Sequence, residues 1–86
     1  MIEIVNRNGK VIHRSKSLRG ILDHGRRSLV EAAVAIPLQH GKGALWVLYA
    51  DGCRCRAEFA DYTVLCDWLR SRRSWAGARR IGDEQF

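Results

Sequence analysis

The chain has 86 residues, which is enough for one domain near the lower size limit of a single hydrophobic core. Its hydrophobic fraction of 47% argues against global disorder, and no apolar run approaches the roughly 18 residues that a membrane-spanning helix needs. The net charge of +6 suits a protein that binds nucleic acid or an acidic protein surface. Three cysteines and no secretory signal ahead of Glu3 predict a reducing, cytoplasmic location.

Residues 1–14 are predicted to form a β-hairpin. An Asn-Gly pair at positions 8 and 9 is typical of a two-residue hairpin turn. This turn pairs Val5 with Ile12 and places Glu3 opposite Arg14 as a cross-strand charge pair. Because an isolated hairpin is marginal in water, we expect this one to lean on the rest of the sheet or on a partner.

Residues 15–28 are predicted to form the first helix. Ser17 is a suitable N-cap, and apolar residues repeat at helical spacing after it. We expect the helix to end near Ser28, which leaves Arg26 and Arg27 at the end where the helix dipole favours cations.

Residues 31–59 are predicted to form an antiparallel meander of three strands, on which the rest of the chain packs. Asp51-Gly52 between two apolar runs predicts a two-residue turn between the last two strands. This turn gathers the following side chains on one apolar face that we assign to the core: Ala44, Trp46, Leu48, Ala50, Cys53, Cys55, Ala57 and Phe59.

The opposite face of the meander then pairs Tyr49 with Arg54, Val47 with Arg56 and Leu45 with Glu58. An aromatic ring beside arginines can stack on bases and bind phosphate, so Tyr49, Arg54 and Arg56 are candidate nucleic-acid-binding residues. Two alternatives remain open. The pairs can be ordinary cation–π packing on a solvated face, or another chain or the N-terminal hairpin can cover this face.

The turn between the first two strands of the meander is predicted to be a three-residue loop, residues 41–43, with Gly43 in the left-handed conformation. This register brings Val34, Ile36 and Leu38 to the face of Trp46 and Leu48. Pro37 suits an edge strand or a bulge, because it donates no backbone hydrogen bond.

Residues 60–75 are predicted to form the second helix. Asp61 is its N-cap, and Tyr62, Leu65, Trp68 and Leu69 form its buried stripe. The helix is predicted to end in a basic and aromatic cluster that contacts phosphate or complements the helix dipole: Arg70, Arg72, Arg73 and Trp75. Residues 76–86 lack apolar periodicity and are predicted to be a mobile tail, which leaves residues 1–75 as the single domain.

No residue pattern predicts a catalytic or metal site. Cys53 and Cys55 are two apart on a strand and share its core face, so we expect buried thiols rather than zinc ligands. The three histidines fall on a predicted strand, helix and turn, at spacings that do not suggest ligation.

The sequence therefore predicts an α+β domain of order β-β-α-β-β-β-α, with both helices packed on one sheet face. The expected function is non-enzymatic binding of nucleic acid with low sequence specificity, without cofactor, metal or membrane. The candidate residues are Tyr49, Arg54, Arg56, Arg70, Arg72, Arg73 and Trp75. The alternative is a protein-interaction module, an accessory protein of a mobile genetic element, whose open sheet face forms a homodimer and whose arginines meet an acidic partner.

Overall fold

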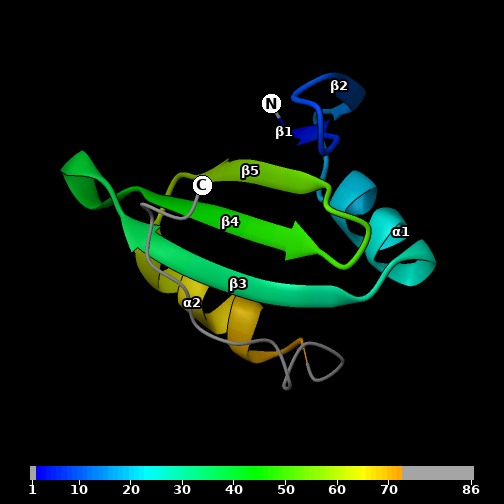
Figure 1. Cartoon of the computed structure of the whole chain (residues 1–86). Coiled ribbons are helices and arrows are strands. Elements are labelled where there is room, and N and C mark those ends of the chain that lie inside the picture. The colour runs from blue at the N-terminus through cyan, green and yellow to red at the C-terminus, as the bar shows by residue number, and fades with distance from the viewer. Residues whose placement is uncertain (1, 73–86) are drawn as a thin grey trace.

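The protein is represented by a computed structural model, which describes residues 2–72 (Figure 1). In this part of the chain, five antiparallel strands form one sheet in the order β2-β1-β5-β4-β3, and the predicted α+β fold is confirmed. The elements are β1 (Ile2–Val5), β2 (Val11–Ser15), α1 (Arg19–Arg27), β3 (Val30–Pro37), a 3₁₀ turn η1 (Gln39–Gly41), β4 (Gly43–Tyr49), β5 (Arg54–Phe59) and α2 (Tyr62–Arg70).

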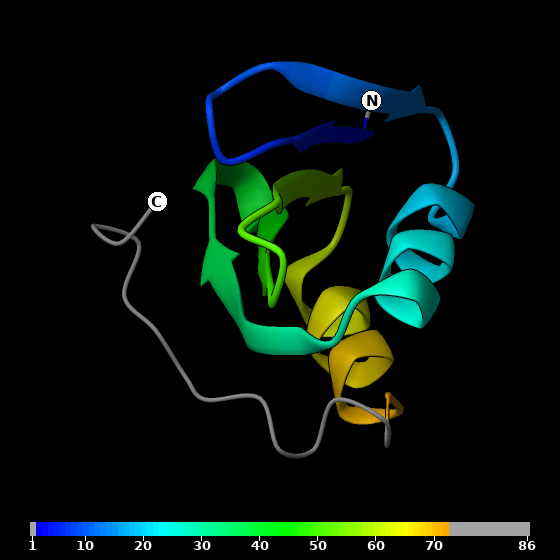
Figure 2. The same ribbon diagram turned by 45° about the vertical axis from the view of Figure 1, so that its right-hand side comes forward.

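Both helices lie on the same side of the sheet, as predicted (Figure 2). Helix α1 packs on β1 and β2, while α2 packs on β3, β4 and β5. The core lies between the helices and the sheet, and its buried side chains are Ile2, Ile4, Ile21, Leu45, Val47, Tyr49, Cys53, Cys55, Ala57 and Leu65. None of the described helices is long and apolar enough to span a bilayer.

The turn between β4 and β5 has three residues, and the predicted two-residue turn is wrong. The Tyr49 N–H donates to the Cys53 carbonyl, and Gly52 occupies the third loop position with φ of 89°. A glycine in this left-handed position is typical of a turn with a G1 bulge. The register shifts by one residue, so Trp46 pairs with Arg56.

This shift reverses the two faces of β4. Leu45, Val47 and Tyr49 are fully buried under the helices, whereas Trp46 and Leu48 lie on the opposite face. Strand β4 is apolar on both faces, so its composition does not determine which face is buried. The length of the turn between β4 and β5 determines the register. The prediction for β5 is correct in part, because Cys53, Cys55 and Ala57 are buried as expected.

The turn between β3 and β4 also differs from the prediction, since the loop is residues 39–41. His40 and Gly41 take the left-handed conformation, with φ of 61° and 74°. Gly43 instead lies in β4 beneath α2, where an added Cβ would be 2.9 Å from the Leu65 side chain and 3.2 Å from the Tyr62 backbone. Gly43 therefore allows the helix to approach the sheet closely.

Strand β3 follows β4 in the reversal of faces. Val34 pairs with Trp46, so the two side chains lie on the same face, as predicted. This face is not the core, contrary to the prediction. The small residues Ala33 and Ala35 are the ones that face α2 and pack against the core. Strand β3 is an edge strand and ends at Pro37, which agrees with the expectation for proline.

The N-terminal hairpin keeps most of its predicted register. Glu3 pairs with Arg14, and the Arg14 Nε donates to the Glu3 carboxylate over 2.8 Å. A bulge after Ile4 places Val5 opposite Val11 rather than Ile12, so that pair is wrong. The predicted two-residue turn is wrong as well, because the Asn6 N–H donates to the Lys10 carbonyl across a three-residue loop that ends at Gly9, with φ of 87°. The hairpin leans on the sheet through pairing of β1 with β5.

The helices are shorter than predicted. Helix α1 begins at Arg19 after Leu18, and no side-chain hydrogen bond caps it. Ser17 is therefore not the N-cap, and its hydroxyl lies 3.3 Å from Ser15 Oγ at the end of β2. The Asp61 cap of α2 is confirmed: its carboxylate accepts hydrogen bonds from the Thr63 and Val64 N–H groups. Helix α2 ends at Arg70, and residues 73–86, including the predicted tail, lie outside the described residues.

Candidate binding surface

The sheet face opposite the helices carries a mixture of apolar and charged side chains. Among residues 2–72, no helix covers it (Figure 2). We call it the open face. Register places the following side chains on it: Glu3, Val5, Arg14, Ala32, Val34, Ile36, Ala44, Trp46, Leu48, Arg54, Arg56 and Glu58.

One row of side chains crosses all five strands of the open face. In strand order it consists of Arg14, Glu3, Arg56, Trp46 and Val34, each the cross-strand partner of the next. The character of the face changes along this row. The part on β3 and β4 is apolar and is called the apolar half, and the part on β5, β1 and β2 is charged and is called the charged half. Trp46 and Arg56 lie at the boundary between the halves.

Arg56 links the two halves of the face. Its guanidinium carbon lies 5.5 Å from the centre of the Trp46 ring, within range of a cation–π contact. Its Nη1 also donates to the Glu58 carboxylate over 2.9 Å, and this hydrogen bond lowers the pKa of Glu58. The Arg56 side chain remains 40% exposed, so it is both held in place and accessible to a ligand.

Tyr49 does not belong to the open face, and its predicted position beside Arg54 is wrong. It is fully buried, its hydroxyl donates to the Ile21 carbonyl over 3.2 Å, and burial raises its pKa. The aromatic residue of the open face is Trp46, which sequence reasoning assigned to the core. Reading Gly52 as the third residue of the turn would have identified Trp46 instead.

The predicted basic end of α2 lies on the helix layer, away from the open face. Arg70 is exposed and 3.6 Å from the Asp67 carboxylate, while the Arg72 guanidinium lies 5.2 Å from the centre of the Trp68 ring. Arg73 and Trp75 fall outside the described residues. Within residues 2–72, the fold therefore does not join Arg70 and Arg72 to Arg54 and Arg56 in one surface.

A third polar group, which the sequence did not reveal, forms where α1 meets the turn between β4 and β5. His24 Nε2 is 3.0 Å from Asp51 Oδ2, and the Cys53 N–H donates to Asp51 Oδ1 over 2.9 Å. Burial and the neighbouring carboxylate raise the pKa of the Cys53 thiol. A protonated thiol is a poor nucleophile, so this arrangement does not activate Cys53 for catalysis.

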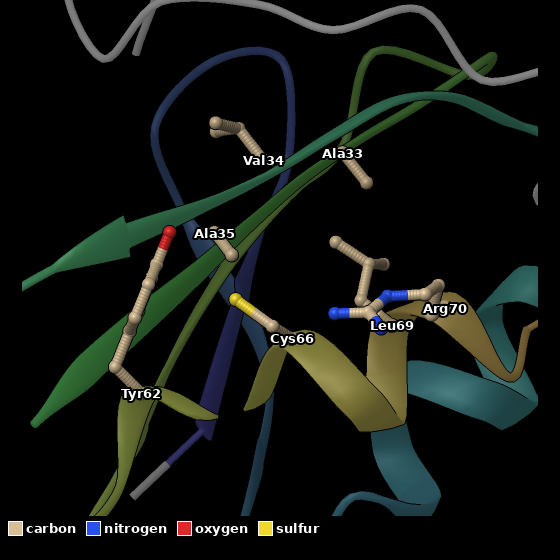
Figure 3. Close-up of a pocket in the computed structure, with 7 residues that line it drawn as sticks. All are labelled: Ala33, Val34, Ala35, Tyr62, Cys66, Leu69 and Arg70. Atoms are coloured by element: carbon tan, nitrogen blue, oxygen red, sulfur yellow. The ribbon is translucent and has the colours of Figure 1, made fainter. Parts of the chain in front are cut away.

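A groove of about 330 Å³ runs between the edge strand β3 and α2 (Figure 3). Ala33 and Ala35 form its strand side, and Tyr62, Cys66, Leu69 and Arg70 form its helix side. Its lining is mostly apolar, with few polar groups to orient a small ligand, so the groove does not define a ligand class.

No protein-family model, curated protein or solved structure matches the chain. The functional assignment therefore depends on the chemistry of the surface.

Proposed function

We propose that the protein is a cytoplasmic, non-enzymatic module that binds single-stranded nucleic acid with low sequence specificity through the open face. The observation that carries this proposal is the stack of Arg56 on Trp46 at the boundary between the apolar and charged halves. An aromatic ring on a sheet face binds any base by stacking, and neighbouring arginines bind the backbone phosphates.

The register suggests how a strand would lie on this surface. One base stacks on Trp46, its neighbours contact Leu48 and Val34, and the phosphates meet Arg54 and Arg56. A duplex keeps its bases stacked internally and cannot use Trp46 in this way, so a single strand is the preferred ligand.

The electrostatic part of the affinity is expected to be modest. Glu58 binds Arg56 and Glu3 binds Arg14, so phosphates compete with carboxylates for these two arginines. Arg7 and Lys10, in the turn between β1 and β2, add further positive charge to the described chain.

The test is a binding titration with fluorescently labelled single-stranded and duplex oligonucleotides, starting at about 50 mM salt. The double variant Arg54→Ala/Arg56→Ala should bind more weakly and show a salt slope flattened by about one unit per lost phosphate contact. Trp46→Ala should reduce single-strand affinity by the roughly 1–3 kcal/mol of one stacked base, with the salt slope unchanged.

The matched control is Arg26→Ala/Arg27→Ala, which removes the same charge from the exposed end of α1. This control should retain the affinity of the wild type. Equal losses in the two double variants would mean that net charge alone causes binding. The proposal is wrong if the wild type shows no binding to either form of nucleic acid at about 50 mM salt.

A second candidate function is a protein-interaction module, such as an accessory protein of a mobile genetic element. The apolar half of the open face favours it, because Val34, Ile36 and Leu48 are only half-buried and no described helix covers them. In this case a second copy or an acidic partner would cover the open face.

A further inference from the structure

We propose that His24, Asp51 and Cys53 form a binding site for a zinc-like divalent cation. The site is separate from the open face and does not depend on the proposed function. It reverses the expectation from the sequence, in which Cys53 is only a buried thiol and the histidines have no ligand partners.

The three ligand atoms are already close together. The His24 ring nitrogen, a carboxylate oxygen of Asp51 and Cys53 Sγ all lie within 4.8 Å of one another, and His24 Nε2 is 3.0 Å from Asp51 Oδ2. Tetrahedral zinc, with bonds of about 2.0 Å to nitrogen and oxygen and 2.3 Å to sulfur, holds neighbouring ligand atoms about 3.3–3.5 Å apart. Small side-chain rotations are therefore enough to complete the triangle.

The backbone that carries these ligands is held in place from several sides. The Ala50 N–H donates to the Leu29 carbonyl over 2.7 Å, and the Asp51 N–H donates to Ser28 Oγ over 3.2 Å. These bonds tie the turn between β4 and β5 to the segment that follows α1. The His24 ring packs edge-on against the Tyr49 ring, with their centres 4.4 Å apart.

The hydrogen bonds of Asp51 point its carboxylate at the proposed site. Oδ1 accepts the Cys53 N–H, which directs Oδ2 to His24. Carboxylate oxygen is an ordinary zinc ligand, so Asp51 can join His24 and Cys53 in the ligand set.

Exposure and ligand type indicate which cation would fit. His24 and Cys53 are 7% and 6% exposed, while the Asp51 side chain is 42% exposed, so a cation enters on the Asp51 side and water can complete its coordination. Imidazole and thiolate ligands favour zinc and similar metals over calcium or magnesium. Cys53 binds as a thiolate and releases its proton to solvent. His24 binds through an unprotonated ring nitrogen and keeps its proton on the other one, so coordination replaces the hydrogen bond between His24 and Asp51.

One positive group opposes a cation at this site. The Arg7 guanidinium lies against Gly52 and donates to the Asp51 main-chain carbonyl over 3.4 Å. Its charge weakens cation binding through space, and this effect provides a test that leaves all three ligands intact.

The experiment titrates Zn²⁺ and Co²⁺ into the full chain after treatment with a chelator, followed by calorimetry and by the absorption spectrum of bound Co²⁺. The wild type should bind one equivalent and show a thiolate-to-cobalt charge-transfer band. Cys53→Ser should lose this band and should lose more affinity than the roughly 10- to 100-fold that removal of an outer-shell partner costs. Cys66→Ser, the matched control at a thiol outside the cluster, should bind like the wild type.

Arg7→Gln should tighten binding, because it removes the opposing charge and keeps the ligands. Circular dichroism would show whether Cys53→Ser is folded. If it is not, Arg7→Gln still tests the site, because it leaves all three ligands unchanged. The proposal is overturned if the wild type shows no thiolate-to-cobalt band, or if folded Cys53→Ser binds with unchanged affinity. Binding that Cys66→Ser abolishes would overturn it as well.

Discussion

Tyr49 and Trp46 lie three residues apart on β4, and their environments differ. Tyr49 is buried between the sheet and α1, where its hydroxyl donates a hydrogen bond to the Ile21 carbonyl and His24 packs against its ring. Trp46 is half-buried on the open face, with Arg56 over its ring. A buried aromatic with a satisfied polar tip stabilises the core, whereas the proposed function assigns the partly exposed ring of Trp46 to a ligand.

The cysteines differ in the same way, and we predict that the native protein has one reactive thiol. Cys66 is half-buried, whereas Cys53 and Cys55 are buried, and burial raises the pKa of Cys55 to about 11. Reaction of metal-free protein with a thiol reagent at about pH 8 should therefore label Cys66 rapidly and the other two slowly, because the thiolate is the nucleophile. Denatured protein should react at all three positions, and Cys66→Ser should lose the rapid phase. A rapid phase that persists in this variant would show that one of the buried positions opens.

At the scale of elements, local sequence signals predicted the type and order of the helices and strands, although both helices are shorter than predicted. The Asp-Gly and Asn-Gly pairs mark two of the turns, and Asp61 marks the start of α2. Register was harder to predict, because Asp51-Gly52 fits both a two-residue turn and the last two positions of a three-residue turn. The two readings place opposite sides of β4 in the core, and a strand that is apolar on both faces does not discriminate between them.

The contact between His24 and Asp51 illustrates what local signals do not contain. These residues are joined only when α1 packs beside the turn between β4 and β5. Neither the spacing of the histidines nor a short motif reports that packing. The candidate metal ligands were therefore not predictable from the sequence, whereas the basic character of Arg54 and Arg56 was.

The cap of α2 gives a prediction at this scale. Asp61→Ala removes the acceptor for two backbone N–H groups and should lower the free energy of unfolding by about 1 kcal/mol. The control is Asp67→Ala on the same helix, whose exposed carboxylate lies 3.6 Å from Arg70 and should contribute much less. Urea denaturation of both variants measures the difference. Equal destabilisation would mean that the charge of the helix, and not the cap, is responsible.

At the scale of the whole molecule, the open face decides between the two candidate functions. If a second copy covers its apolar half, Leu48→Asp should abolish self-association, because the dimer would then bury an unpaired charge. Val47 cannot serve for this test, although the sequence placed it on this face, because it is fully buried under the helices. The matched control is Leu29→Asp, at a side chain that is 79% exposed in the connection between α1 and β3. Sedimentation velocity over a range of concentrations should show a loss of dimer only in Leu48→Asp, and a wild type that stays monomeric would exclude self-association.

The strand order also determines how the chain must fold. The first strand pairs with the fifth, Ile4 opposite Cys55, so this part of the sheet closes only after all of β5 is available. Contacts between residues so distant in sequence have a large loop-closure cost and slow the folding of small domains. Until β1 arrives, the backbone N–H and C=O groups on that side of β5 have no strand partner and can pair with another chain. Docking of the N-terminal hairpin therefore converts β5 from an edge strand into an internal strand and leaves β2 and β3 as the edges of the described sheet.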